Sequence, residues 1–238
     1  MYRRRTTRAG KTLEIEKYTC TRMECGKRVR GPKRNPTPED MKAVNERNAQ
    51  RRLTWIINEN FSPGDIHMIL TYQDPAPEKE EAKTELSKFI RELRKIYKKA
   101  GTELKYITVT EYHGKRIHHH LLLSAIDTRL LRGAWTRGRP KITFLDESGS
   151  YWRLAGYFRK ELRRTGEAGE KKRICTSRNL KRPEPECREI SAKNFRKEPA
   201  AKIRHKGTVY YPDASRPWEK YIDEVTGYEH YIFYYRRL

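Results

Sequence analysis

The order of periodic segments between residues 65 and 163 is the feature that most limits how this chain can fold. Apolar and polar residues alternate in 65–72, as in a strand, and apolar residues recur at helical spacing in 78–100. The later segments are, in order, strands at 104–112 and 117–124 around a hairpin loop at 113–116, a short helix near 127–135, a strand at 141–145 and a helix at about 150–163. This β-α-β-β-α-β order, followed by a helix, predicts an α+β fold of the ferredoxin-like or split βαβ kind, with an antiparallel sheet and helices on one face.

Apolar residues are concentrated in the centre of the chain. Leu, Ile, Val and Phe together number 43 of 238 residues, a share low enough to allow disorder when the net charge is +23. The 15 Tyr and 4 Trp add surface that can be buried, and 39 of the residues at 61–160 are apolar. We therefore expect a basic N-terminal arm and helix at 1–60, a folded core at 61–165 and a basic, Tyr-rich C-terminal extension at 166–238.

The helix in the N-terminal part has a recognisable start. Thr37 is a good N-cap, Pro38 suits the first helical position, and Glu39 and Asp40 favour the positive end of the helix dipole. We expect this helix to run to about Asn60.

Positive charge is gathered in two stretches. Residues 1–34 carry a net charge of +9 and residues 161–206 a net charge of +8. Such clusters are typical of proteins that bind a polyanion, most often nucleic acid, although a solvated charged surface is the alternative. The candidate nucleic-acid-binding residues are Arg3, Arg4, Arg5, Lys171, Lys172, Arg173, Arg178 and Lys181.

Neither a membrane segment nor a disulfide framework is expected. Apolar runs fall short of the roughly 20 residues that span a bilayer, and the basic start MYRRRTTRAGK is not followed by a hydrophobic stretch. The cysteines, Cys20, Cys25, Cys175 and Cys187, are irregularly spaced, so we expect reduced thiols and a cytoplasmic protein. A zinc site built from all four is the alternative.

Three consecutive histidines lie in the strand at 117–124. The two-residue period of a strand sends His118 and His120 to one face and His119 to the other. If residues 113–116 form the loop, Glu111 lies directly across from His118. Two imidazoles and a carboxylate with open positions suit a divalent metal that polarises a phosphoryl oxygen, whereas a histidine packed in the core is the alternative.

The helix at 150–163 carries a candidate nucleophile. Tyr157 and Lys160 are one turn apart, and Tyr157 lies away from the apolar side that includes Tyr151 and Phe158. A free phenol has a pKa near 10 and needs help to attack, which a metal-polarised phosphate and a neighbouring Lys supply. An exposed tyrosine on a basic helix is the alternative.

Three motifs in this order resemble those of HUH endonucleases, especially the replication initiators of rolling-circle phages and plasmids. They are a strand that ends in Leu70-Thr71-Tyr72, a His-x-His strand at 118–120 and a Tyr-x-x-Lys helix at 157–160. The resemblance covers roughly residues 60–165, and Asn60-Phe61 and the stretch at 177–181 are similar to the bacterial phage-associated branch.

The resemblance implies a role for each site residue. His118 and His120 would bind Mg²⁺ or Mn²⁺ with Glu111 as the third ligand, Tyr157 would attack one DNA strand, and Lys160 would be its charge partner. The attack leaves a 5′-phosphotyrosyl link and a free 3′-OH that primes replication.

Two positions depart from the family pattern. The residue between the paired histidines is usually hydrophobic, and His119 here leaves open a shifted register in which His119 faces the metal. His119 shares its face with Ile117 and Leu121, which favours the core side for it. Glu161 stands where a second nucleophile would be, so the chain resembles a single-tyrosine enzyme, with Tyr151 as an alternative accessory residue.

The sequence therefore predicts a metal-dependent, site-specific single-strand DNA endonuclease and strand transferase that initiates rolling-circle replication. A plasmid relaxase or a single-tyrosine transposase is the alternative within the same chemistry, and a non-enzymatic basic nucleic-acid-binding protein is the alternative from another class. The expected partners are single-stranded or supercoiled origin DNA and, because the sequence has no helicase P-loop, host helicase and polymerase.

Overall fold

The protein is an α+β chain whose two antiparallel sheets belong to two compact units. The computed structural model describes residues 1–20, 35–73, 76–113, 116–164, 174–196, 199–223 and 226–237. The first unit comprises residues 1–59, 150–152 and 182–238, and the second comprises residues 60–149 and 153–181. None of the helices in the described ranges is long and apolar enough to cross a membrane.

The second unit contains a five-stranded sheet with the order β6-β3-β5-β4-β7, and every neighbouring pair is antiparallel. Its strands are β3 (Ile66–Leu70), β4 (Tyr106–His113), β5 (Arg116–Leu123), β6 (Lys141–Phe144) and β7 (Ile174–Thr176). Its helices are α2 (Lys79–Lys99), α3 (Arg129–Arg132) and α4 (Trp152–Arg164), of which the first residue of α4 belongs to the first unit. The order of elements expected from the periodicity is confirmed over this region.

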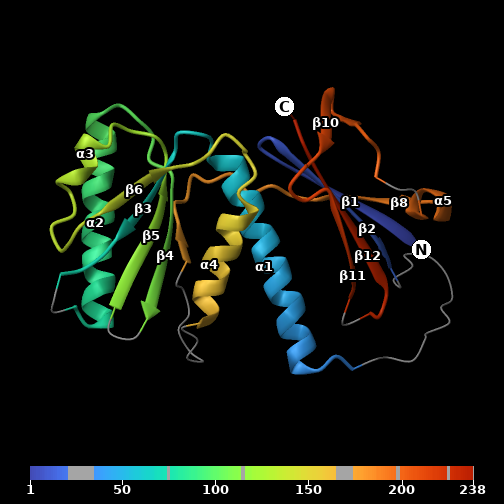
Figure 1. Ribbon diagram of the computed structural model, residues 1–238, viewed down its shortest axis with the longest axis horizontal. Coiled ribbons are helices and arrows are strands. Elements are labelled where there is room, and N and C mark those ends of the chain that lie inside the picture. The colour runs from blue at the N-terminus through green and yellow to red at the C-terminus, as the bar shows by residue number, and fades with distance from the viewer. Residues whose placement is uncertain are drawn as a thin grey trace. The chain divides into compact units, whose positions relative to one another are not determined.

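Helices cover both faces of this sheet rather than the one face expected (Figure 1). The apolar side of α2 packs with Met68 and Leu121 on one face, and Leu131 of α3 joins the same cluster. Phe158 of α4 packs instead against the rings of His67 and His120 on the opposite face. The strongly amphipathic α4 needs an apolar surface of its own, and that face offers one once the polar rings are paired.

The β4–β5 hairpin has the register expected from a loop at 113–116. Glu111 is paired with His118 and Tyr112 with Ile117. Because directly opposed residues in an antiparallel pair point to the same side, this register brings Glu111, His118 and His120 to one face.

The first unit contains a seven-stranded sheet made from both ends of the chain. Its strands are β1 (Tyr2–Ala9), β2 (Thr12–Thr19), β8 (Glu186–Ile190), β9 (Ile203–His205), β10 (Thr208–Pro212), β11 (Trp218–Ile222) and β12 (Glu229–Arg236), and α5 (Ala192–Arg196) lies between β8 and β9 in the chain. The arm and the extension expected from charge are thus, over these residues, one folded unit. The physical reason is that Leu13 and Ile15 pack with Phe233 and Tyr235, which closes a core between the two ends of the chain.

Helix α1 (Pro38–Asn60) begins and ends where the sequence predicted. Thr37 accepts a hydrogen bond on its hydroxyl from the Asp40 backbone, and the Asp40 carboxylate accepts one from the Thr37 backbone, which is a reciprocal N-terminal cap. Gly10 in the β1–β2 turn has φ +55°, and a Cβ there would lie 1.9 Å from the carbonyl oxygen of Asn58. The close approach of this turn to α1 therefore requires glycine.

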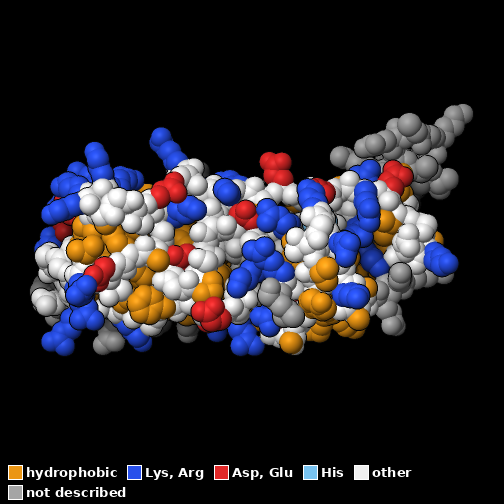
Figure 2. All heavy atoms as spheres, turned by 90° about the horizontal axis from the view of Figure 1, so that it is seen from above, with side chains coloured by type: hydrophobic (Ala, Val, Ile, Leu, Met, Phe, Trp, Pro, Cys, Tyr) orange, Lys and Arg blue, Asp and Glu red, His pale blue; other side chains and the backbone are white. Residues whose placement is uncertain are grey.

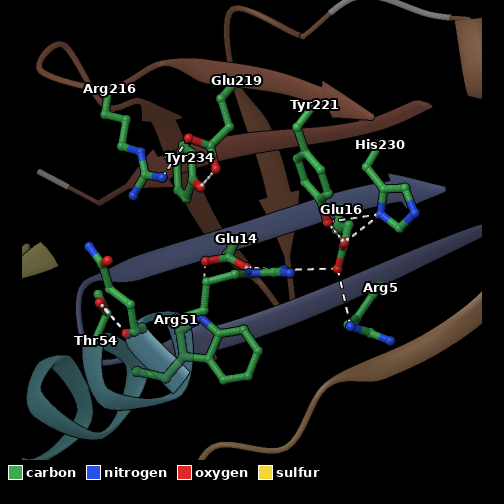
Figure 3. Close-up of polar contacts among 12 residues, drawn as sticks. Arg5, Glu14, Glu16, Arg51, Thr54, Arg216, Glu219, Tyr221, His230 and Tyr234 are labelled. Atoms are coloured by element: carbon green, nitrogen blue, oxygen red, sulfur yellow. Dashed lines mark hydrogen bonds and ion pairs between the residues drawn. The ribbon is translucent and has the colours of Figure 1, made fainter. Parts of the chain in front are cut away.

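Ion pairs join α1 to the sheet of the first unit (Figure 3). Arg51 donates to Glu14 over 2.9 Å and to Glu16 over 2.8 Å, and Trp55 donates to Glu14 over 3.0 Å. Glu16 also accepts from Arg5 over 3.2 Å, and its carboxylate lies 2.9 Å from His230 Nδ1. These contacts satisfy two buried carboxylates, whose burial without partners would cost several kcal/mol.

Candidate active site

His120 lies at the centre of a polar cluster on the α4-covered face of the five-stranded sheet. Its Nε2 is 3.2 Å from Glu111 Oε2, and its Nδ1 is 3.3 Å from Nε2 of His67. The His120 side chain is 2% exposed and that of Glu111 is 12% exposed. His118, half-buried, lies on the same face opposite Glu111. The structure therefore brings three sequence-predicted residues to one face and adds His67.

His67 is a residue that sequence reasoning missed. It stands on β3, and its ring stacks on that of His120 with centroids 5.6 Å apart. Ile69 is the residue paired with His120, so His67 is the next residue on the same face of β3. The alternation of β3 signals which face His67 occupies, but only the adjacency of β3 and β5 reveals its partner.

Burial lowers the pKa of His67 to about 4, and the neighbouring His120 and then Lys141 contribute to this shift. His67 is thus neutral near pH 7, with one ring nitrogen that donates and one that accepts. Its Nε2 either donates to His120 Nδ1 or accepts a proton from it. In the second arrangement the lone pair of His120 Nε2 points at the Glu111 carboxylate, and a cation between these two acceptors would then hold them together.

Tyr157 extends from α4 to the edge of this cluster. Its ring lies 5.3 Å from that of His120 in an edge-to-face arrangement, and 41% of the residue is exposed. The next residue, Phe158, is fully buried and packs on both His67 and His120. Phe158 therefore fixes α4 on the sheet, while Tyr157 is left beside His120 and open to solvent.

Lys160 is exposed one turn after Tyr157, as its place in α4 implies. Tyr151 precedes the helix and is buried in the first unit, where its backbone donates to Asn58 over 2.9 Å. This burial agrees with the expectation that Tyr151 is a packed ring, and Tyr157 is the exposed one of the two.

His119 lies on the opposite face, away from the cluster. Its Nδ1 is 2.9 Å from the Thr110 hydroxyl and its Nε2 is 2.8 Å from the Tyr72 hydroxyl, with Trp135 edge-on to the ring. Burial lowers the pKa of His119 to about 4, and the two flanking histidines contribute to this shift. His119 is thus a satisfied core histidine, and the shifted register is not the one that this hairpin adopts.

The donor types at the cluster fit a divalent cation, although the side chains are not arranged around one. Across the described part of the chain, no group of three His, Cys, Asp or Glu is placed to hold a metal. Glu111 and His120 instead contact each other directly, so a metal would have to enter between Oε2 and Nε2. An imidazole oriented from behind by a second polar group, as His67 orients His120, is a common arrangement for metal-binding histidines.

The candidate nucleic-acid-binding residues lie in different places. Arg5 is paired with the buried Glu16, whereas Arg4 points to the other face of the same sheet. Arg178 and Lys181 are exposed in the second unit, and Lys171, Lys172 and Arg173 lie outside the described residues. Lys and Arg side chains are abundant on the face shown in Figure 2, and acidic side chains are fewer.

Of the four cysteines, those in the described part of the chain are free thiols. Cys20 is half-buried, whereas Cys175 and Cys187 are exposed, and Cys25 lies outside the described residues. Cys20 and Cys187 belong to the first unit and Cys175 to the second.

Comparison with known proteins gives a family match for the second unit. Residues 65–162 match the model of the family described as Replication-associated protein ORF2. The matched segment begins just before β3 and ends within α4, so it contains Glu111, the His120 cluster and Tyr157. No curated protein and no solved structure matches the chain. The family match is consistent with a replication initiator and covers fewer than half of the residues.

Proposed function

We propose that the second unit is a metal-dependent, site-specific nuclease of the HUH kind, which cuts one DNA strand and initiates rolling-circle replication. The observation that carries this proposal is the meeting of Glu111, His120 and Tyr157, from β4, β5 and α4, on one face of the sheet. The strand order β6-β3-β5-β4, with α2 and α3 on one face, supports the ferredoxin-like assignment that the resemblance implies.

Tyr157 is the proposed nucleophile. As its hydroxyl oxygen attacks phosphorus it loses its proton, the bond from phosphorus to the 3′ oxygen breaks, and that oxygen takes up a proton. The products are a 5′-phosphotyrosyl link and a free 3′-OH, so bonds and protons balance. Lys160 supplies positive charge near the attacking oxygen and the phosphoryl group, which stabilises the transition state more than the ground state.

His118, His120 and Glu111 are the proposed ligands of Mg²⁺ or Mn²⁺. A bound cation polarises the phosphoryl oxygen and neutralises charge that develops there. His67 is the proposed positioning residue for His120, because its Nε2 holds the back of that ring. Strand separation and synthesis are left to host helicase and polymerase, acting on single-stranded or supercoiled origin DNA.

A denaturing gel tests the proposal directly. The full chain is incubated with Mn²⁺ and labelled single-stranded oligonucleotides tiled across the DNA element that carries its gene. We expect a covalent protein–DNA band with at least one oligonucleotide, abolished by EDTA. Peptide mapping should place the nucleotide on Tyr157, and attachment to any other residue would falsify the nucleophile assignment.

Two other functions are distinct outcomes of the same experiment. A relaxase or a single-tyrosine transposase would form the same adduct, and only the sequence of the cleaved oligonucleotide, at a transfer origin or an element end, separates these from a replication initiator. A nucleic-acid-binding module is favoured by the net charge of +23 alone. That module would bind the oligonucleotides and give no adduct with any of them.

A further inference from the structure

The two faces of the seven-stranded sheet differ in how their charges are balanced. On the face toward α1, the carboxylates of Glu14 and Glu16 accept hydrogen bonds from Arg51 and Arg5 (Figure 3). The cations of that face therefore serve the fold.

The opposite face carries a row of basic residues that crosses five strands. Its successive cross-strand partners are Arg188 of β8, Arg4 of β1, Lys17 of β2, Tyr231 of β12 and Lys220 of β11. We call these five residues the cation row. Four of the five are basic and none is acidic, and neighbouring strands are about 4.8 Å apart, so the row extends over roughly 19 Å.

Side-chain contacts confirm that the row shares one face. Arg4 Nε donates to the hydroxyl of Thr6, two residues along the same strand, over 3.2 Å. Burial and then the neighbouring Arg188 lower the pKa of Arg4. Like charges placed directly opposite each other destabilise a sheet, so the cost of this row to folding is a sign of a use outside the fold.

Aromatic rings lie among these cations. Lys17 lies over the ring of Phe233 at 4.9 Å, and Lys220 over that of Tyr231 at 5.5 Å. Trp218, which is paired with Phe233 in the neighbouring row, is 50% exposed. The face thus offers charge for a phosphate backbone and an exposed ring on which a base can stack.

Acidic residues near the row have partners of their own. Glu229 pairs with Lys220, and Glu186 pairs with Lys206 of the β9–β10 turn. Arg188, Arg4 and Lys17 form the uninterrupted basic part of the row, at three successive cross-strand positions.

We propose that this face of the seven-stranded sheet is a binding surface for single-stranded DNA, with Arg188, Arg4 and Lys17 on the phosphates and Trp218 against a base. The inference rests on the proposed function only in naming DNA as the polymer, because the cation row belongs to a different unit from Tyr157. Single-stranded DNA fits better than duplex or an acidic protein, because only an unpaired strand presents phosphates and free base faces together.

The test compares two triple variants of the full chain. The row variant is Arg4→Gln, Lys17→Gln and Arg188→Gln. The control variant, Lys98→Gln, Lys99→Gln and Arg132→Gln, removes the same charge from exposed positions in the second unit. The affinity for a fluorescent oligonucleotide is measured by anisotropy across a series of salt concentrations, in EDTA so that no cleavage occurs.

We expect the row variant to lower the logarithmic salt slope by about 2, at about 0.7 for each of three lost phosphate contacts. The control should change the slope far less. Trp218→Ala should weaken binding about 5- to 100-fold to the oligonucleotide and leave duplex binding unchanged. The Tm of the row variant should stay the same or rise, because repulsion within the sheet is relieved.

Three results would overturn the inference. They are equal slopes for the two triple variants, an equal effect of Trp218→Ala on duplex and single strand, and competition by polyglutamate as strong as that by DNA at equal charge. The adduct assay keeps this test separate from the proposed function. A row variant that binds weakly yet forms adduct at saturating oligonucleotide supports both ideas, and a row effect without any adduct supports the binding surface and removes the nuclease.

Discussion

Each unit of the molecule contains a histidine beside a glutamate, and the two pairs have different surroundings. In the first unit, His230 Nδ1 lies 2.9 Å from Glu16, which also accepts hydrogen bonds from Arg51, Arg5 and Tyr221. In the second unit, His120 Nε2 lies 3.2 Å from Glu111, and the other side of its ring meets His67.

The difference lies in how far each carboxylate is already neutralised. His230 and the two arginines hold the pKa of Glu16 far below its usual range despite its burial, so its charge is committed to the fold. Glu111 contacts the imidazole of His120 and shares its face of the sheet with the exposed Tyr157. A His–Glu contact is therefore not evidence for a metal site by itself, and the balance of charge around it decides between structure and chemistry.

The largest expected effect separates the two histidines. We expect His120→Ala to abolish the covalent DNA adduct, because it removes a metal ligand beside the nucleophile. His230→Ala should leave adduct formation within about twofold and lower stability by about 1 to 2 kcal/mol, as expected for loss of a hydrogen bond to a charged group. The gel assay and chemical denaturation measure the two effects, and equal loss of adduct in both variants would break the comparison.

A large effect on stability is expected at Arg51. Arg51→Met leaves Glu14 and Glu16 buried with fewer cations, and removing one partner of a buried ion pair costs about 3 to 5 kcal/mol. Urea unfolding measures the loss. Arg137→Met is the control, because its pairs with Glu81 and Glu85 are at the surface and should contribute at most about 1 kcal/mol.

A smaller effect on activity is expected at His67. His67→Phe keeps the ring volume but removes the contact with His120 Nδ1, and loss of such an orienting contact typically lowers metal affinity or activity about 10- to 100-fold. The rate of adduct formation is measured over a range of Mn²⁺ concentrations. Rescue of the rate by high Mn²⁺ indicates a positioning role, whereas an unchanged rate at every concentration would exclude one.

The mildest test uses pH. His67 and His119 have folded pKa values of about 4 and a reference value of 6.5, so the unfolded chain binds more protons in this window and stability falls as the pH drops from about 6.5 to about 4. The cost is about 1 kcal/mol for each histidine over the first pH unit below 6.5. The lowered pKa of Glu16 has the opposite window, because its contribution is present above its reference value of 4.5 and is lost below it.

Amide hydrogen exchange, corrected for its intrinsic pH dependence, distinguishes these windows. Between pH 7 and pH 5.5 we expect β3 and β5 to lose protection while β2 and β12 retain it. Equal losses in both sheets would show that the two units do not titrate separately.

Local patterns predicted the second unit well. The periodicity of 65–163 predicted the right sequence of elements, and the four-residue loop fixed the register that opposes Glu111 and His118. His67 was missed because its role depends on the pairing of β3 with β5, which are far apart in sequence. Local alternation assigns a residue to a face but does not say which strand lies alongside.

The seven-stranded sheet was not predicted, for two physical reasons. The basic residues of β1, at Arg3, Arg4 and Arg5, hide the alternation that marks a strand, because cations occupy both of its faces. In addition, the core partners of Leu13 and Ile15 come from β12, at the other end of the chain. Net charge indicated a polyanion partner but could not show that Arg5 is engaged by Glu16 while Arg4 faces the other way.

The pairing of β2 with β12 has a consequence for the order in which the protein matures on the ribosome. Translation completes nearly all of the second unit before any of β8 to β12 has been made, so the β1–β2 hairpin emerges first and waits without a neighbour. Domains usually fold as units during synthesis, and a basic hairpin with open edges resists aggregation better than an apolar one. The arginines and lysine of β1 and β2 thus protect the nascent chain until β12 arrives.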